Sequence, residues 1–206
     1  MNKVHSILWG LKFRSSLLYH YLFNKKVRKR TAWHEMRYHL FSPRMYAVAN
    51  ERATLINKDE KYSYYRIKGY DDTFIYPASA PLYSFAMVMA EARPQHWHYY
   101  EIPQTAVAPG DVVVDCGSAE GFFAFKHQHT ASRIFVLEPL PLFVDSLREL
   151  FRHKNKVIII AITTYHEGQD YEQLIALIKG VVPEYNHLVK GIHYISGNPV
   201  MLHMWI

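Results

Sequence analysis

The segment from Asp111 to Phe123 constrains the fold of this 206-residue chain more than any other stretch. Three consecutive valines end at Asp115, glycines follow at positions 117 and 121, and an apolar run comes next. This order predicts a short strand, a tight turn and the start of a helix. Such a unit is typical of parallel α/β sheets, whose strand ends bind nucleotide cofactors.

The two glycines and a downstream carboxylate make this turn a candidate cofactor loop. Gly117 has no Cβ, so its backbone can turn and approach a ligand closely, and Gly121 would let the following helix pack closely against the strand. A second apolar run, from Arg133, ends in Glu138. Because ligands bind at the carboxyl ends of parallel strands, Glu138 is a candidate acceptor for the hydroxyls of an adenosine ribose.

The spacing of the loop bears on which cofactor it would hold. A dinucleotide fingerprint reads Gly-x-Gly-x-x-Gly, whereas this loop reads Asp-x-Gly-x-x-x-Gly, with Ala119 where a middle glycine could stand. Asp115 and Glu120 would repel a pyrophosphate but suit a charged amine and a sulfonium. The pattern favours S-adenosylmethionine over NAD, and an NAD-linked reductase is the weaker alternative. A strand–glycine–helix turn that binds nothing is the structural alternative.

The single cysteine limits both disulfide and metal chemistry. Cys116 excludes an internal disulfide framework and a multi-cysteine zinc site, and it fits a reducing, cytoplasmic compartment. Its place at the end of an apolar strand predicts a buried, inert thiol. His96 and His98 alternate on an extended segment with no third ligand nearby, so we predict no metal site there.

The N-terminal part of the chain is basic and aromatic. Residues 1–50 contain 10 Lys and Arg against one acid, Glu35, although the net charge of the whole chain is only +6. Lys12 and Arg14 interrupt the apolar segment 1–23, and the uncharged stretch 15–24 is too short to span a bilayer. No small-residue cleavage site follows, so we expect no signal peptide.

The basic cluster 25–30 has three interpretations. Residues 1–30 could make a peripheral membrane contact, with a helix in the interface and cations on phosphate headgroups. The cluster could contact nucleic acid, although no aromatic-interleaved RNA motif accompanies it, and we do not expect a nucleic-acid partner. It could also be a solvated face of a helix that packs against the rest of the chain.

The remaining elements follow from periodicity and turn signals. We expect a β-hairpin over 62–76, a buried helix over 81–92, an amphipathic helix opened by Pro139 and Pro141, and a helix after Asp170. The apolar run 157–165 predicts a strand, and residues 188–205 predict an antiparallel hairpin.

From about residue 96 to residue 206, the chain resembles FkbM-type S-adenosylmethionine-dependent methyltransferases of class I. The resemblance is carried by Tyr99-Tyr-Glu, the run from Pro109 to Phe123, Val136-Leu-Glu-Pro and Ile162-Thr-Thr-Tyr-His166, together with the closing hairpin. It implies O-methylation of a hydroxyl on a glycan, polyketide-like or other small-molecule acceptor. It also implies that Asp115, Gly117, Ser118, Ala119 and Gly121 hold the methionine end of the cofactor and Glu138 its ribose. Residues 1–95 form an extension outside the resemblance, and 96–206 the Rossmann-like domain.

The chain departs from the family after about residue 160. Family members carry a further strand with an acidic Asp-x-Glu-Gly type motif before the Thr-Tyr-His segment, and this chain has none. We infer an internal deletion and expect 157–165 to pair beside the central strand 112–116. The predicted fold is a reduced α/β sheet of about five strands, closed by the C-terminal hairpin, with helices on both faces. The alternative function is an inactive, cofactor-binding remnant that lacks the acceptor-site strand.

A general base for the acceptor hydroxyl can be sought at the end of the 157–165 strand. Methyl transfer depends mainly on holding the acceptor and the methyl group in line, and a base adds roughly 10²–10⁴-fold. His166 is the candidate base, with Tyr165 as a pocket wall, and a surface or structural histidine is the alternative.

Overall fold

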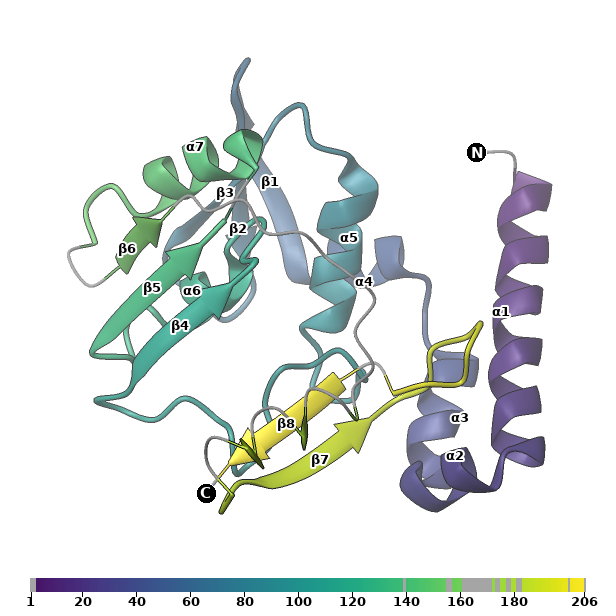
Figure 1. Cartoon of the computed structure of the whole chain (residues 1–206). Coiled ribbons are helices and arrows are strands. Elements are labelled where there is room, and N and C mark those ends of the chain that lie inside the picture. Colours follow the sequence, from purple (N-terminus) through teal and green to yellow (C-terminus); the bar gives the residue numbers. More distant parts are fainter. Residues whose placement is uncertain are drawn as a thin grey trace. The chain divides into compact units, whose positions relative to one another are not determined.

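The computed structural model (Figure 1) describes residues 3–138, 140–154, 157–160, 172, 175–176, 179–180, 183–199 and 201–205. The chain forms two compact units. Unit 1 combines residues 1–43, 91–105 and 168–206, and unit 2 combines 44–90 and 106–167. Each unit draws on segments from both sides of residue 95.

Unit 1 begins with three helices. They are α1 (Lys3–Phe23), α2 (Lys25–Arg30) and α3 (Trp33–Phe41). The Asn24 side chain caps α2 by accepting from the backbone N–H groups of Lys26 and Val27, at 3.0 and 3.3 Å. At the start of α3, the Ala32 N–H donates to Glu35 Oε2 at 3.0 Å. Side-chain oxygens therefore satisfy backbone donors that no helical carbonyl can reach. None of the described helices combines the length and apolar character needed to cross a membrane.

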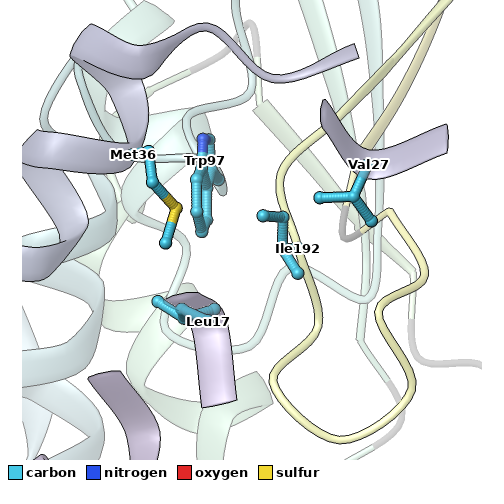
Figure 2. Packing of buried hydrophobic residues seen from close by; sticks show 5 residues of the cluster. All are labelled: Leu17, Val27, Met36, Trp97 and Ile192. Atoms are coloured by element: carbon cyan, nitrogen blue, oxygen red, sulfur yellow. The ribbon is translucent and has the colours of Figure 1, made fainter. Parts of the chain in front are cut away.

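One hydrophobic cluster ties the two ends of the chain together within unit 1. The buried residues are Leu17, Val27, Met36, Trp97 and Ile192, shown in Figure 2. Phe13 and Tyr194 pack against the cluster, with their ring centroids 5.7 Å apart. The N-terminal helices thus share a core with the segment that follows the first C-terminal strand.

The C-terminal hairpin belongs to unit 1, whereas the parallel sheet belongs to unit 2. β7 (Asn186–Lys190) and β8 (Met201–Trp205) pair antiparallel, as predicted. Among the described strands they pair only with each other, so the five predicted strands are not joined in one sheet in the described residues. Within unit 1, Ile192 and Tyr194, which follow β7, pack in one cluster with Leu17 and Phe13 of α1.

Unit 2 contains a three-stranded antiparallel sheet in the order β1-β2-β3. Its strands are β1 (Ala53–Lys58), β2 (Tyr62–Ile67) and β3 (Thr73–Pro77), preceded by α4 (Met45–Arg52) and followed by α5 (Leu82–Glu91). The predicted hairpin is confirmed, with Tyr62 opposite Pro77. β1 was not predicted. Phe74 of β3 is fully buried, and its ring lies 5.6 Å from that of Phe122 and 5.2 Å from that of Phe125.

The second sheet of unit 2 is parallel, in the order β4-β5-β6. β4 (Val112–Cys116) leads through α6 (Phe122–His127) to β5 (Arg133–Leu137), and α7 (Pro141–Leu150) leads on to β6 (Val157–Ile160). The two predicted strands before residue 140 are confirmed. Cys116 is paired with Leu137, so β4 and β5 end at the same edge of the sheet.

The position of β6 corrects the predicted strand order. β6 pairs with β5 and not with the 112–116 strand, and β4 is an edge strand among the described residues. Leu147 of α7 lies against Gly121 at the start of α6, so both helices pack on one side of the sheet. When successive right-handed crossovers place their helices on the same side of a sheet, each new strand is added on the same side of the strand before it. β6 is therefore added beside β5, on the side away from β4.

The other face of β4 is exposed, contrary to the expectation of helices on both faces. Val112 and Val114 are 62% and 59% exposed, and Cys116 on the same face is also exposed. The prediction of a buried thiol is therefore wrong. Alternate residues of a strand point to opposite faces, and within unit 2 no described helix covers this one.

Candidate cofactor site at the ends of β4 and β5

The loop that follows β4 is tied to the end of β5 by backbone hydrogen bonds. The N–H groups of Gly117 and Ser118 donate to the carbonyl oxygen of Leu137 at 2.8 and 3.2 Å, and the Gly121 N–H donates to the Ser118 carbonyl at 2.9 Å. Gly117 and Gly121 have φ values of +75° and +78°, which glycine adopts without steric cost. The loop is thus a compact turn lying over two adjacent strand ends.

The Glu138 side chain accepts hydrogen bonds from two backbone N–H groups, one of them in this turn. Its Oε2 accepts from the Ala119 N–H at 2.6 Å, and its Oε1 accepts from the Leu140 N–H at 2.8 Å. Glu138 is 3% exposed, and each of its two oxygens accepts one backbone N–H. A carboxylate offers about four lone-pair sites, which leaves acceptor capacity on both oxygens for hydroxyl donors.

Asp115 is the second carboxylate of the site. Its Oδ2 accepts from the Ser118 hydroxyl at 2.6 Å. Burial raises the pKa of Asp115, the charge of Glu138 raises it further, and the Ser118 hydrogen bond opposes both effects. Two carboxylates, one of them disfavoured as an anion, make this a place where a bound cation would be stabilised.

Ala119 carries backbone strain at the centre of the loop. Among the described residues it is the one non-glycine with a positive φ, +48°. A left-handed alanine costs about 1–2 kcal/mol, and such strain persists where surrounding contacts fix it. The hydrogen bond to Glu138 supplies that contact.

The two glycines differ in their surroundings. A Cβ on Gly121 would lie 2.3 Å from Leu147 Cδ2 and 3.5 Å from Phe151 Cε2, whereas a Cβ on Gly117 would meet nothing within 4 Å. Gly121 is therefore needed for close packing, although its neighbour is α7 and not the strand. Gly117 borders open space, as a position that faces a ligand requires.

Most of the predicted site residues come together in this turn. They are Asp115, Gly117, Ser118, Ala119, Glu120, Gly121 and Glu138. Glu120 also reveals a neighbour that the sequence analysis missed, because its charge, after the larger effect of burial, helps raise the pKa of Tyr76 to about 12. Nothing in the β3 sequence distinguishes Tyr76 from the other tyrosines of the hairpin. His166 and Tyr165 lie outside the described residues.

A separate cleft of about 770 Å³ lies between the antiparallel sheet and α7. Its lining includes Glu60, Lys61, Asp145, Arg148 and Arg152, and none of the loop residues. With Glu149, the lining carries three acidic and three basic side chains, so its charge favours neither an anionic nor a cationic ligand. We therefore do not place the cofactor there.

No family model matches the chain, and no curated protein matches it. In the part of the chain that the structure describes, no group of three or more His, Cys, Asp or Glu side chains is arranged to hold a metal ion. What the structure defines is a mixed α/β protein in which a glycine-containing loop and two carboxylates meet at the ends of adjacent parallel strands.

Proposed function

We propose that this chain binds S-adenosylmethionine on the loop of residues 117–121 and transfers its methyl group to a hydroxyl of a glycan or other small-molecule acceptor. The observation that carries the proposal is the hydrogen-bonded link between Ala119 and Glu138. It brings the loop after β4 and the carboxylate after β5 to the edge where parallel sheets bind their ligands.

The charge of the site supports this cofactor over a dinucleotide. Asp115, Glu120 and Glu138 stand in or beside the loop, and no Lys or Arg lies between residues 112 and 125. A pyrophosphate would be repelled by these carboxylates, whereas the amine and sulfonium of S-adenosylmethionine are cationic. Coulomb attraction therefore favours the methyl donor.

Each residue of the loop has a role in the proposal. Gly117 leaves room for the methionine moiety, Asp115 with Ser118 faces its amine, and the remaining lone pairs of Glu138 accept from the ribose hydroxyls. The cofactor supplies an activated methyl group, and the protein contributes mainly by orienting the two reactants. We keep His166 as the proposed base for the acceptor hydroxyl.

A second candidate function is a cofactor-binding protein without turnover. It is favoured by the place of β4 at the edge of its sheet, where no described strand pairs on its free side. In the family that the chain resembles, that side carries a further strand, which would supply much of the acceptor pocket. Cofactor binding is common to the two candidates, and methyl transfer distinguishes them.

Isothermal titration with S-adenosylmethionine and S-adenosylhomocysteine tests the binding step. We expect micromolar binding by the wild-type chain and its loss in Asp115→Ala and Glu138→Ala. Asp71→Ala and Glu60→Ala remove exposed carboxylates of the same types and should leave binding unchanged. Absence of binding by a folded wild-type chain would contradict both candidate functions.

Release of S-adenosylhomocysteine in the presence of hydroxyl acceptors tests the chemical step. The panel should include simple sugars and phenolic alcohols, since the acceptor class is proposed only as a hydroxyl compound. Release that depends on the acceptor supports the enzyme. Tight binding without release for any acceptor supports the remnant.

A further inference from the structure

Helix α1 is apolar on two opposite faces. Phe13, Leu17 and Tyr21 point into the cluster of unit 1. On the opposite side lies an outer stripe, whose spacings of three, four and seven residues place its members along one face of the helix. Its members are Leu8, Leu11, Leu18, Tyr19, Leu22 and Phe23, which are 58%, 57%, 36%, 60%, 50% and 74% exposed.

A group of cations accompanies the outer stripe. Residues 1–30 contain eight Lys and Arg, and the first acid of the chain is Glu35. α2 exposes Lys25, Lys26, Arg28 and Lys29 while its Val27 is fully buried. The Asn24 N–H donates to the His20 carbonyl at 3.0 Å, and the Arg28 N–H donates to the Asn24 carbonyl at 3.0 Å. The cations therefore follow the end of the stripe without an intervening loop.

We propose that the outer stripe and the cations of α2 dock on an anionic lipid surface, with α1 lying in the plane of the interface. An interfacial helix buries its apolar face at the headgroup and acyl boundary while its cations contact phosphates. α1 has 21 residues and is about 32 Å long. Lys12 and Arg14 lie within it, and their long side chains can reach the headgroups while their stems cover apolar surface.

Charge and composition together argue for lipid over other occupants. A second copy of the chain would bring eight more cations against these eight, with no acid among residues 3–34 to pair with them. Nucleic acid would use the cations but would leave the leucines in water. A bilayer of anionic lipid offers both an apolar layer and negative charge, which matches both parts of this surface.

Sedimentation with vesicles of phosphatidylcholine, with and without phosphatidylserine, tests the proposal on the full chain. We expect binding to the anionic vesicles that weakens as salt is added. Leu11→Gln, Leu18→Gln and Leu22→Gln should each weaken it by roughly tenfold. Leu82→Gln is the matched control, because Leu82 of α5 is 58% exposed and lies outside the surface.

The cations are tested in the same way. Lys25→Gln, Lys26→Gln and Lys29→Gln should each weaken binding by about fivefold. Lys58→Gln and Lys68→Gln, at exposed positions of unit 2, should change it little. All substituted side chains are exposed, so circular dichroism should show unchanged folding.

Several outcomes would overturn the proposal. A folded chain that does not sediment with anionic vesicles would overturn it. Vesicle binding that the leucine variants do not change would also overturn it. Tighter binding to single-stranded RNA than to vesicles, insensitive to the leucine variants, would assign the cations to nucleic acid. A dimer in light scattering that Leu18→Gln dissociates would assign the stripe to a second copy. None of these readouts depends on cofactor binding.

Discussion

The backbone N–H of Ala119 donates to Oε2 of Glu138 at 2.6 Å, across 19 residues of sequence. The other carboxylate oxygen accepts from the Leu140 N–H at 2.8 Å. One buried side chain therefore fixes the loop after β4 and the start of the segment that leads into α7. The strained backbone of Ala119, with φ of +48°, depends on this arrangement.

Glu138→Gln should destabilise unit 2 by about 1–3 kcal/mol, the cost of leaving one buried donor without an acceptor. The amide has one oxygen and one NH₂ group, so one of the two backbone N–H groups would face another donor. Urea unfolding measures the loss, and Glu60→Gln at an exposed position is the control. Equal stability of Glu138→Gln and the wild type would show that the carboxylate does not hold the loop.

Gly121 and Gly117 are expected to have different roles, Gly121 in packing and Gly117 in ligand binding. Gly121→Ala should cost roughly 2–4 kcal/mol, because it adds overpacking against Leu147 to an unfavourable positive φ. Gly117→Ala should cost only about 1–2 kcal/mol, since its Cβ would meet nothing. Thermal unfolding of both variants gives the comparison. For Gly117→Ala we also expect weaker binding of S-adenosylhomocysteine, and a larger stability loss there than at Gly121 would refute this division of roles.

Asp115→Asn should raise the melting temperature at neutral pH. Burial raises the folded-state pKa of Asp115 above its ordinary value of 3.8, so the folded state favours the protonated carboxyl. The stability that this carboxyl contributes is fully present below pH 3.8 and is lost as pH rises through the folded-state pKa. Asparagine cannot ionise, and its oxygen can still accept from Ser118. The gain should disappear below pH 3.8, and Asp71→Asn should show no such pattern.

The same variant links stability to the proposed function. If the Asp115 carboxylate receives the cofactor amine, Asp115→Asn should be more stable and should bind S-adenosylmethionine more weakly. A variant that is both more stable and equally tight in binding would remove Asp115 from the proposed site.

Unit 1 should lose stability in acid because of His39. Its ring stacks on Trp97 with centroids 3.7 Å apart, and its Nε2 accepts the Trp97 backbone N–H at 3.3 Å. Burial, and the nearby His96, His98 and Lys190, lower the pKa of His39 from 6.5 to about 3. A lowered folded-state pKa contributes stability above pH 6.5 that is lost as pH falls toward 3.

Between pH 7 and pH 5 this single histidine should cost about 2 kcal/mol. His39→Gln should be less stable at pH 7, because the stacked ring is lost, and should show a shallower decline over the same interval. His34→Gln, at an exposed position of α3, is the control. An unchanged pH slope in His39→Gln would contradict the assignment.

Local signals predicted the elements of the site well. Three valines before Asp115, and the apolar run before Glu138, specify β4 and β5 almost to the residue. The glycines at 117 and 121 specify the turn, because few other residues tolerate its backbone angles. Each of these patterns depends only on residues close together in the sequence, so it can be recognised without the structure.

Long-range pairing was not predictable in the same way. β6 pairs with β5 because α7 packs on the same side of the sheet as α6. The contact of Leu147 with Gly121 fixes that side. The packing of Ile192, after β7, in one cluster with Leu17 of α1 is likewise a contact between distant parts of the sequence. The residues around Glu138 likewise do not predict that its two oxygens accept from the backbone N–H groups of Ala119 and Leu140.

Amide hydrogen exchange with and without S-adenosylhomocysteine tests the central claim most directly, because it locates the bound cofactor on the chain. The account predicts slower exchange in peptides that cover residues 115–121 and 136–140, with little change in β1, β2 and β3. Protection confined to other segments, or no protection at saturating ligand in a folded chain, would contradict the cofactor site proposed at the ends of β4 and β5.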